Sequence, residues 1–158
     1  MDKRRAAMIG GVVAGVLTTA VMWGGRKSGV LGKTLDRDAV DWIDRTTGSR
    51  DAIGDVGTSL VEFGNHLAAS AAFGRFYAEL RDHFPDTPPP LLGALFGTGL
   101  YVVNIAGIAP LLGITEGEVE AGPRKAGERW MLHIVQSVVT AMIAERLTRD
   151  PTTQPIEE

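Results

Sequence analysis

The sequence predicts an all-α, multi-pass transmembrane four-helix bundle with an amphipathic helical connection after the first span. Charged residues are segregated along the chain: none lies in 6–25 or 91–114, although the sequence has 16 Lys and Arg and 19 Asp and Glu. Two further stretches, 56–80 and 130–147, are apolar apart from one polar face each. Together these observations predict spans at about 6–25, 56–80, 91–114 and 130–147.

The average composition hides this segregation. With 44% hydrophobic and 22% charged residues, it looks like an ordinary soluble protein. The length of 158 residues allows one domain, expected over 1–150, with a polar, disordered tail at 151–158. The absence of cysteine excludes thiol catalysis, iron–sulfur clusters and Cys-ligated zinc. A net charge of −3 argues against nucleic acid as a partner.

The first span, 6–25, contains 20 uncharged residues, which form a helix about 30 Å long and match the hydrocarbon core of a bilayer. Basic residues precede and follow it, and Trp23 lies near one end, where interfacial aromatic residues belong. The alternative is a secretory signal peptide. The length of the apolar run and the lack of an A-x-A cleavage site favour a retained helix.

The connection after this span carries its own helical pattern. Apolar residues recur on one face, with charged residues opposite, and Gly48 is placed to end the helix. Such a helix fits the plane of a membrane interface, or it packs on the bundle as a short soluble helix. The apolar residues of this face are Leu35, Ala39, Trp42 and Ile43.

The span 91–114 is uncharged throughout, whereas a helix of a soluble protein normally shows one face to water. Three prolines, 88–90, stop any helix before it, and Pro110 lies near its far end. Taken alone, 56–80 and 130–147 do not predict membrane spans. In a chain that already has two uncharged spans, they are interpreted as transmembrane helices with a polar face. A soluble four-helix interaction domain with two buried helices is the alternative for the whole chain.

The polar side chains of the two weaker spans form one stripe on each helix, with a histidine in each stripe. Facing lipid, each polar group would cost a few kcal/mol. We therefore expect the stripes to face each other or a cavity, together with polar residues of the third span. The predicted intramembrane network comprises Glu62, Asn65, His66, Tyr77, Asn104, His133 and Gln136.

Four interpretations of this network are open. The first is a structural hydrogen-bond network, and the second is a proton or solute relay through Glu62 and His66. The third is a bis-histidine haem b site, and the fourth is a metal site. The haem alternative takes His66 and His133 as axial ligands from two parallel helices, and the metal alternative adds Glu62. The leading interpretation needs no cofactor and no metal. No catalytic constellation is present, so an enzymatic role is not favoured.

The 20 glycines are nearly twice the usual share, and several are spaced four residues apart. In lipid, helices associate through the close approach of backbones at such small residues. Packing inside one bundle is favoured over the alternative, a homo-oligomer formed through the first helix. The pairs include Gly11 with Gly15 and Gly93 with Gly97.

Several short features follow one another in a fixed order between residues 62 and 146. They are the in-helix His66, then Phe73 and Tyr77, Phe84–Pro85 before the Gly93/Gly97 span, the exit Pro110–Thr115, and a Glu128…His133 helix ending in Glu145–Arg146. In these features the chain resembles the small bacterial inner-membrane proteins typified by YagU. The resemblance implies a multi-pass protein of the bacterial cytoplasmic (inner) membrane with a stress- or proton-linked role. The first connection departs from that family because it lacks a proline-arginine run.

Overall fold

The computed structural model describes residues 1–31 and 35–149, and all secondary structure in these residues is helical. This confirms the all-α class. The predicted disordered tail, 151–158, lies outside the described residues. The elements in chain order are α1 (Lys3–Lys27), α2 (Leu35–Thr47), α3 (Ser49–His83), α4 (Pro89–Leu100), a π-helix η1 (Tyr101–Ile108), α5 (Ala109–Leu111), α6 (Glu118–Ala121) and α7 (Pro123–Thr148).

Helix α1 contains the predicted range 6–25 and extends beyond it at both ends. The carboxylate of Asp2 caps the helix by accepting a hydrogen bond from the Arg5 amide (3.3 Å). Arg26 and Lys27 lie in the last turn, where positive charge complements the helix dipole.

The predicted amphipathic connection is confirmed as α2. Gly48 ends it with a positive φ of 66°, and its amide donates to the Asp44 carbonyl oxygen (2.7 Å). Helix α3 starts directly afterwards, seven residues before the predicted range 56–80. Gly54 kinks it with φ 67° and ψ 178°, a backbone conformation that is essentially limited to glycine.

The third predicted span, 91–114, corresponds to one continuous helical segment, Pro89–Leu111, which changes its hydrogen-bond pattern along the way. Pro89 occupies the first turn of α4, where its missing N–H costs nothing. The segment widens into the π-helix η1 just before Pro110, whose ring nitrogen cannot continue the α-helical ladder. Gly113, with a positive φ of 68°, lies just past its end.

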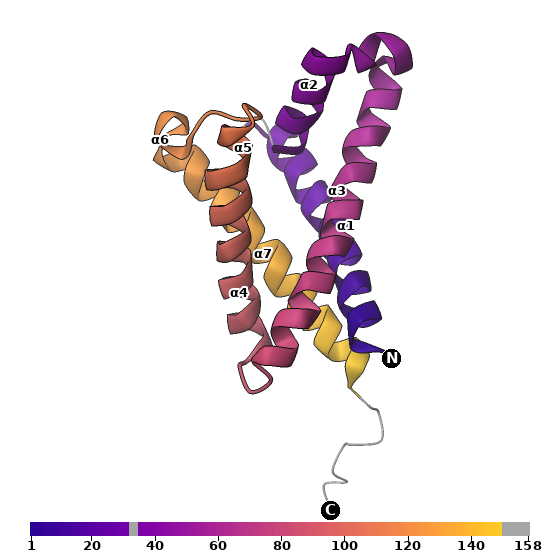
Figure 1. Cartoon of the computed structure of the whole chain (residues 1–158), viewed down its shortest axis with the longest axis vertical. Coiled ribbons are helices and arrows are strands. Elements are labelled where there is room, and N and C mark those ends of the chain that lie inside the picture. Colours follow the sequence, from indigo (N-terminus) through magenta and orange to yellow (C-terminus); the bar gives the residue numbers. More distant parts are fainter. Residues whose placement is uncertain (32–34, 150–158) are drawn as a thin grey trace, which may run out of the picture.

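Helix α7 begins seven residues before the predicted range 130–147. Gly122, with φ 82°, and Pro123 at the first helical position define its start. The start of α1, the end of α7 and the loop after α3 lie at one end of the molecule, whereas α2 and α6 lie at the other (Figure 1). We call these the terminal end and the α2/α6 end. Helices α3 and α7 therefore run in the same direction, as the sequence predicts.

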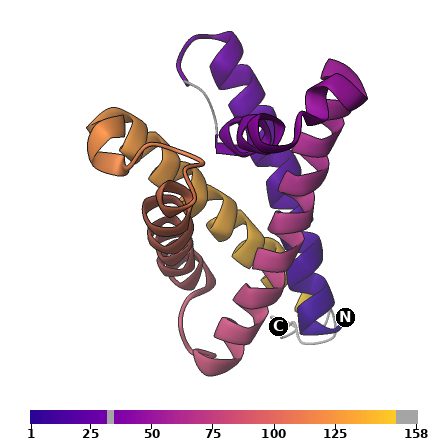
Figure 2. The same cartoon turned by 45° about the horizontal axis from the view of Figure 1, so that its top comes forward.

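The long helices do not close into a ring. Helix α1 packs along both α3 and α7, and α4 packs along α7, while α3 and α4 scarcely contact each other. They meet near the loop that joins them and diverge towards the α2/α6 end (Figure 2). The long helices thus form an open arrangement, in which α3 and α4 flank a space instead of packing together.

Glycine sets the distance between the packed helices. A Cβ on Gly11 would lie 2.1 Å from the Ser70 carbonyl oxygen, and one on Gly74 would lie 2.2 Å from that of Ala7. In the other pair, a Cβ on Gly97 would lie 2.5 Å from the His133 carbonyl oxygen. The predicted small-residue faces are therefore used within the chain, where only hydrogen fits between the backbones.

Candidate functional site

Four of the seven residues predicted for the network line one cavity. His66 of α3, Asn104 of η1, and His133 and Gln136 of α7 share a space of about 180 Å³. Apolar residues of α1, α3 and α4 complete its wall. At about 30 Å³ per water molecule, the space could hold roughly six waters. The divergence of α3 from α4 creates this space over a floor made by α1 and α7.

The two histidines are oriented by main-chain carbonyl groups. Nε2 of His66 donates to the Gly15 carbonyl oxygen (3.1 Å), and Nδ1 of His133 donates to that of Arg129 (2.8 Å). Because Gly15 has no side chain, α3 approaches α1 closely enough for the first of these bonds. The ring of His133 also packs edge-to-face on Tyr101, with centroids 6.3 Å apart.

Small hydroxyl side chains that the predicted list omits also belong to the wall. Ser70 accepts a hydrogen bond from the Gln136 amide (2.9 Å), which joins α3 to α7 at mid-height. Thr18, Ser137 and Thr140 line the same space. A signal for Ser137 and Thr140 exists in the sequence, since they fall on the same helical face as His133.

A buried arginine closes the cavity towards the α2/α6 end. Arg129 is 6% exposed and pairs with Glu118 of α6 (2.8 Å) and, more loosely, with Asp38 of α2 (3.6 Å) and Glu116 (3.7 Å). Glu118 also accepts a hydrogen bond from the Tyr101 hydroxyl (2.8 Å). These contacts connect α2, η1, α6 and α7. The sequence did not reveal this cluster because its members are far apart along the chain.

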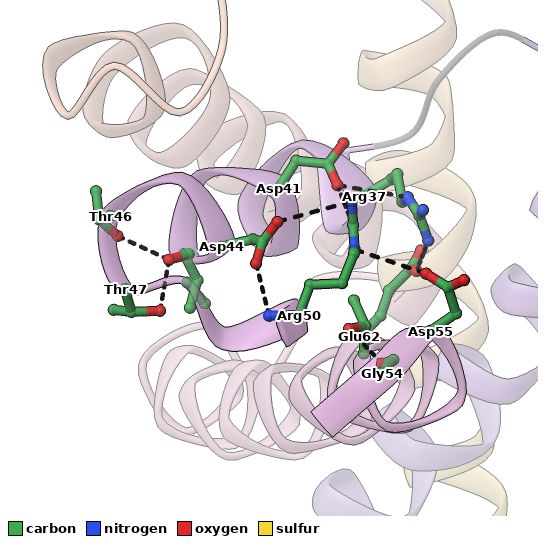
Figure 3. A network of polar contacts seen from close by, with 11 residues as sticks. Arg37, Asp41, Asp44, Thr46, Thr47, Arg50, Gly54, Asp55 and Glu62 are labelled. Carbon is green, nitrogen blue, oxygen red and sulfur yellow. Dashed lines mark hydrogen bonds and ion pairs between the residues drawn. The ribbon is translucent and has the colours of Figure 1, made fainter. Parts of the chain in front are cut away.

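Glu62 lies away from the cavity wall. Its carboxylate faces Arg37 of α2 (3.4 Å) and Arg26 of α1 (3.8 Å) at the α2/α6 end. It thereby joins the polar network that holds α2 on α3 (Figure 3). In this network Arg50 donates to Asp41 (2.7 Å), a hydrogen bond that raises the pKa of the guanidinium. Glu62 therefore helps to hold α2 on α3.

The remaining two predicted network residues also lie elsewhere. Asn65 is exposed on α3. Tyr77 is 2% exposed and packs edge-to-face against Phe96, with centroids 5.8 Å apart, and it also borders a separate hollow at the terminal end. The structure thus gathers the histidines with Asn104 and Gln136, and places the other three residues outside this group.

The positions of the histidines bear on the haem and metal alternatives. Nε2 of His66, the usual haem ligand atom, is directed at the Gly15 carbonyl oxygen, and Nδ1 of His133 is bonded to the Arg129 carbonyl oxygen. In this arrangement His66 does not present Nε2 as an axial ligand. Within the described part of the chain, no three His, Asp or Glu side chains gather as metal ligands.

No family model, curated protein or solved structure matches this chain. The similarity to the YagU-like proteins stays a prediction from the sequence. The site must therefore be interpreted from its own chemistry.

Proposed function

We propose that this chain is a non-enzymatic, multi-pass protein of the bacterial cytoplasmic (inner) membrane, whose cavity binds a small polar group inside the bilayer. In this proposal α1, α3, α4 with its continuation through η1 and α5, and α7 cross the membrane. His66 and His133 give the site a proton-linked character, because imidazole is the side chain whose charge normally changes between pH 5 and 8.

The distribution of side-chain size carries the membrane proposal. The helix interfaces bury mainly small residues: among the described residues, seven of the 12 buried hydrophobic residues are alanine. Large apolar side chains face outward instead. On α1 alone the exposed ones are Met8, Ile9, Val13, Val16, Leu17, Val21 and Trp23. A soluble protein buries such residues, whereas in lipid they face the solvent and small residues form the interfaces.

Length and charge support the same conclusion. Two helical segments, Lys3–Lys27 and Pro89–Leu111, are long and apolar enough to cross a membrane. Ion pairs gather at the two ends of the molecule, such as Lys3 with Asp82 (2.8 Å) at the terminal end and the Arg129 cluster at the other. This leaves an apolar belt between two charged surfaces.

The shape of the cavity favours binding over conduction. Towards the terminal end its wall stops at Thr140, where a Cβ on Gly10 would lie only 2.7 Å from the Thr140 carbonyl oxygen. Helices α1 and α7 are in close contact at this point, so the polar space does not continue between them. Glu62, which a relay through His66 would use, lies outside the wall.

Extraction of bacterial membranes with alkaline carbonate tests the membrane proposal. We expect the full chain to stay in the membrane pellet and to require detergent for release, because its outward face is apolar. Recovery in the soluble fraction without detergent would contradict the proposal and favour the soluble interaction domain. A Soret band in protein purified from haem-replete cells, lost in both His66→Ala and His133→Ala, would replace the proposed site with a haem site.

A further inference from the structure

A second hollow adjoins the polar cavity. It is an apolar groove of about 580 Å³ between α3 and α4, on the side towards the terminal end. Its wall consists almost entirely of phenylalanine, leucine and valine side chains, among them Phe76, Leu80, Leu95 and Val103. Gly99 lies in this wall, and a Cβ there would meet no atom within 4 Å.

The groove and the polar cavity are continuous. Four residues line both: Phe73, Phe96, Leu100 and Asn104. Asn104 is the polar residue at this boundary. The polar cavity, with the histidines and Gln136, lies on one side of this boundary, and the hydrocarbon side chains of the groove lie on the other. One elongated site therefore has a hydrogen-bonding half and an apolar half.

We propose that this combined site binds a single-chain amphiphile with an uncharged, hydrogen-bonding head, such as a monoacylglycerol, taken from the leaflet at the α2/α6 end. The inference rests on the proposed membrane location and names the group that the polar cavity holds. The head lies among the imidazole, amide and hydroxyl groups. The alkyl chain lies in the groove and points towards the terminal end, as the chain of a lipid in that leaflet does.

The charges at the cavity wall favour an uncharged head. Lys125 bonds Glu116, Glu128 pairs with Arg124 (3.1 Å), and Arg129 pairs with Glu118 (2.8 Å). Each of these ionised groups already has a counter-ion. The remaining polar groups of the wall are amide, imidazole and hydroxyl groups, which bond the hydroxyls of an uncharged head.

The groove matches one alkyl chain in length. Along α4 and η1 it extends from Leu92 to Val103, which is about 16 Å at about 1.5 Å per residue. Its open side faces the region where the large apolar side chains are exposed, including Leu95 at 59% exposure and Phe76 at 59%. A chain can therefore enter sideways from the bilayer.

Native mass spectrometry of the detergent-purified full chain, titrated with a long-chain monoacylglycerol, tests the inference. We expect one bound molecule per chain, and weaker binding of an alkane of equal length and of glycerol. Gly99→Leu fills the groove and should weaken binding about tenfold, through lost burial of the alkyl chain. The matched control is Gly64→Leu, which also enters open space but lines neither hollow, and should bind like wild type.

The head is tested separately with Gln136→Leu, which should weaken the monoacylglycerol but not the alkane. Its control is Asn65→Leu at the exposed face of α3. Unchanged binding in both Gly99→Leu and Gln136→Leu would overturn the inference, as would a dimer that Gly99→Leu dissociates and that carries no amphiphile. If the protein stays in the membrane after carbonate extraction but binds no monoacylglycerol, only the inference about the amphiphile is overturned. If the protein is soluble, the membrane proposal is overturned.

Discussion

Gly11 and Gly74 form the tightest contacts between helices, because each Cα lies against a carbonyl group of the facing helix. A Cβ at these positions would lie 2.1 and 2.2 Å from the oxygens of Ser70 and Ala7. These are backbone atoms, which cannot swing aside as a flexible side chain can. Helices α1 and α3 can therefore approach this closely only because Gly11 and Gly74 carry a hydrogen atom in place of a Cβ.

Gly11→Ala should lower the free energy of unfolding by about 1–2 kcal/mol. Alanine gains about 1 kcal/mol of helix propensity over glycine, but overpacking costs about 1–3 kcal/mol and dominates where backbone must move. Thermal unfolding of the detergent-solubilised protein measures the change. Gly64→Ala enters open space and should be neutral or slightly stabilising. Equal stability of the two variants would contradict the close-packing argument.

Individual elements are joined at their ends by ion pairs. At the terminal end, Lys3 of α1 donates to Asp82 of α3 (2.8 Å), and Arg4 pairs with Glu79 (3.2 Å). The hydrogen bond from Lys3, with its positive charge, lowers the pKa of Asp82 below its usual value of 3.8. Since this pKa is depressed in the folded state, the pair stabilises the fold above the unfolded pKa and ceases to do so as the pH falls through the folded pKa.

Asp82→Asn should therefore lower the melting temperature slightly at pH 7 and have no effect once the pH is below the pKa of the folded carboxyl. The effect is small because both side chains are largely exposed and solvent screens the pair. Thermal melts across the acidic range measure it. Asp86→Asn, in the exposed loop after α3, is the control and should show no such pH-dependent difference. A difference that persists in acid would contradict the assignment.

The whole molecule has ion pairs at both ends, and the start of α1 and the end of α7 lie at the same end (Figure 1). The chain has no cysteine, so each introduced cysteine provides a unique label. A cysteine at Asp86 would mark the terminal end, whereas a cysteine at Ser28 or at Val119 would mark the α2/α6 end. In the proposed membrane topology these two ends face opposite sides of the bilayer.

In right-side-out vesicles, a membrane-impermeant maleimide should give the same result for Ser28→Cys and Val119→Cys. If it labels these two, it should leave Asp86→Cys unlabelled, and if it labels Asp86→Cys, it should leave these two unlabelled. Disrupting the vesicles should make all three reactive. If all three were equally accessible in sealed vesicles, the four-span arrangement would be wrong. Unequal labelling of Ser28→Cys and Val119→Cys would also contradict it, because both lie at the α2/α6 end.

Some helix ends could be predicted because their causes are local, whereas α3 and α7 each begin seven residues before the predicted range. Gly48 ends α2 and Pro89 starts α4 through their own backbone restrictions, and apolar periodicity predicts the amphipathic α2. The two uncharged stretches and the four-residue glycine spacing likewise lie within single helices. The π-helix could not be predicted, since its hydrogen-bond register depends on how the segment before Pro110 packs.

The composition of the site depended on contacts between distant segments. The sequence places Glu62 and His66 on one helical face, but Arg26 and Arg37 hold Glu62 at the α2/α6 end while His66 reaches Gly15 inside. The divergence of α3 from α4 decides that a cavity exists at all. Periodicity defines which residues share a face. Only the packing of α1 between α3 and α7 defines what each face meets, because those contacts join residues far apart along the chain.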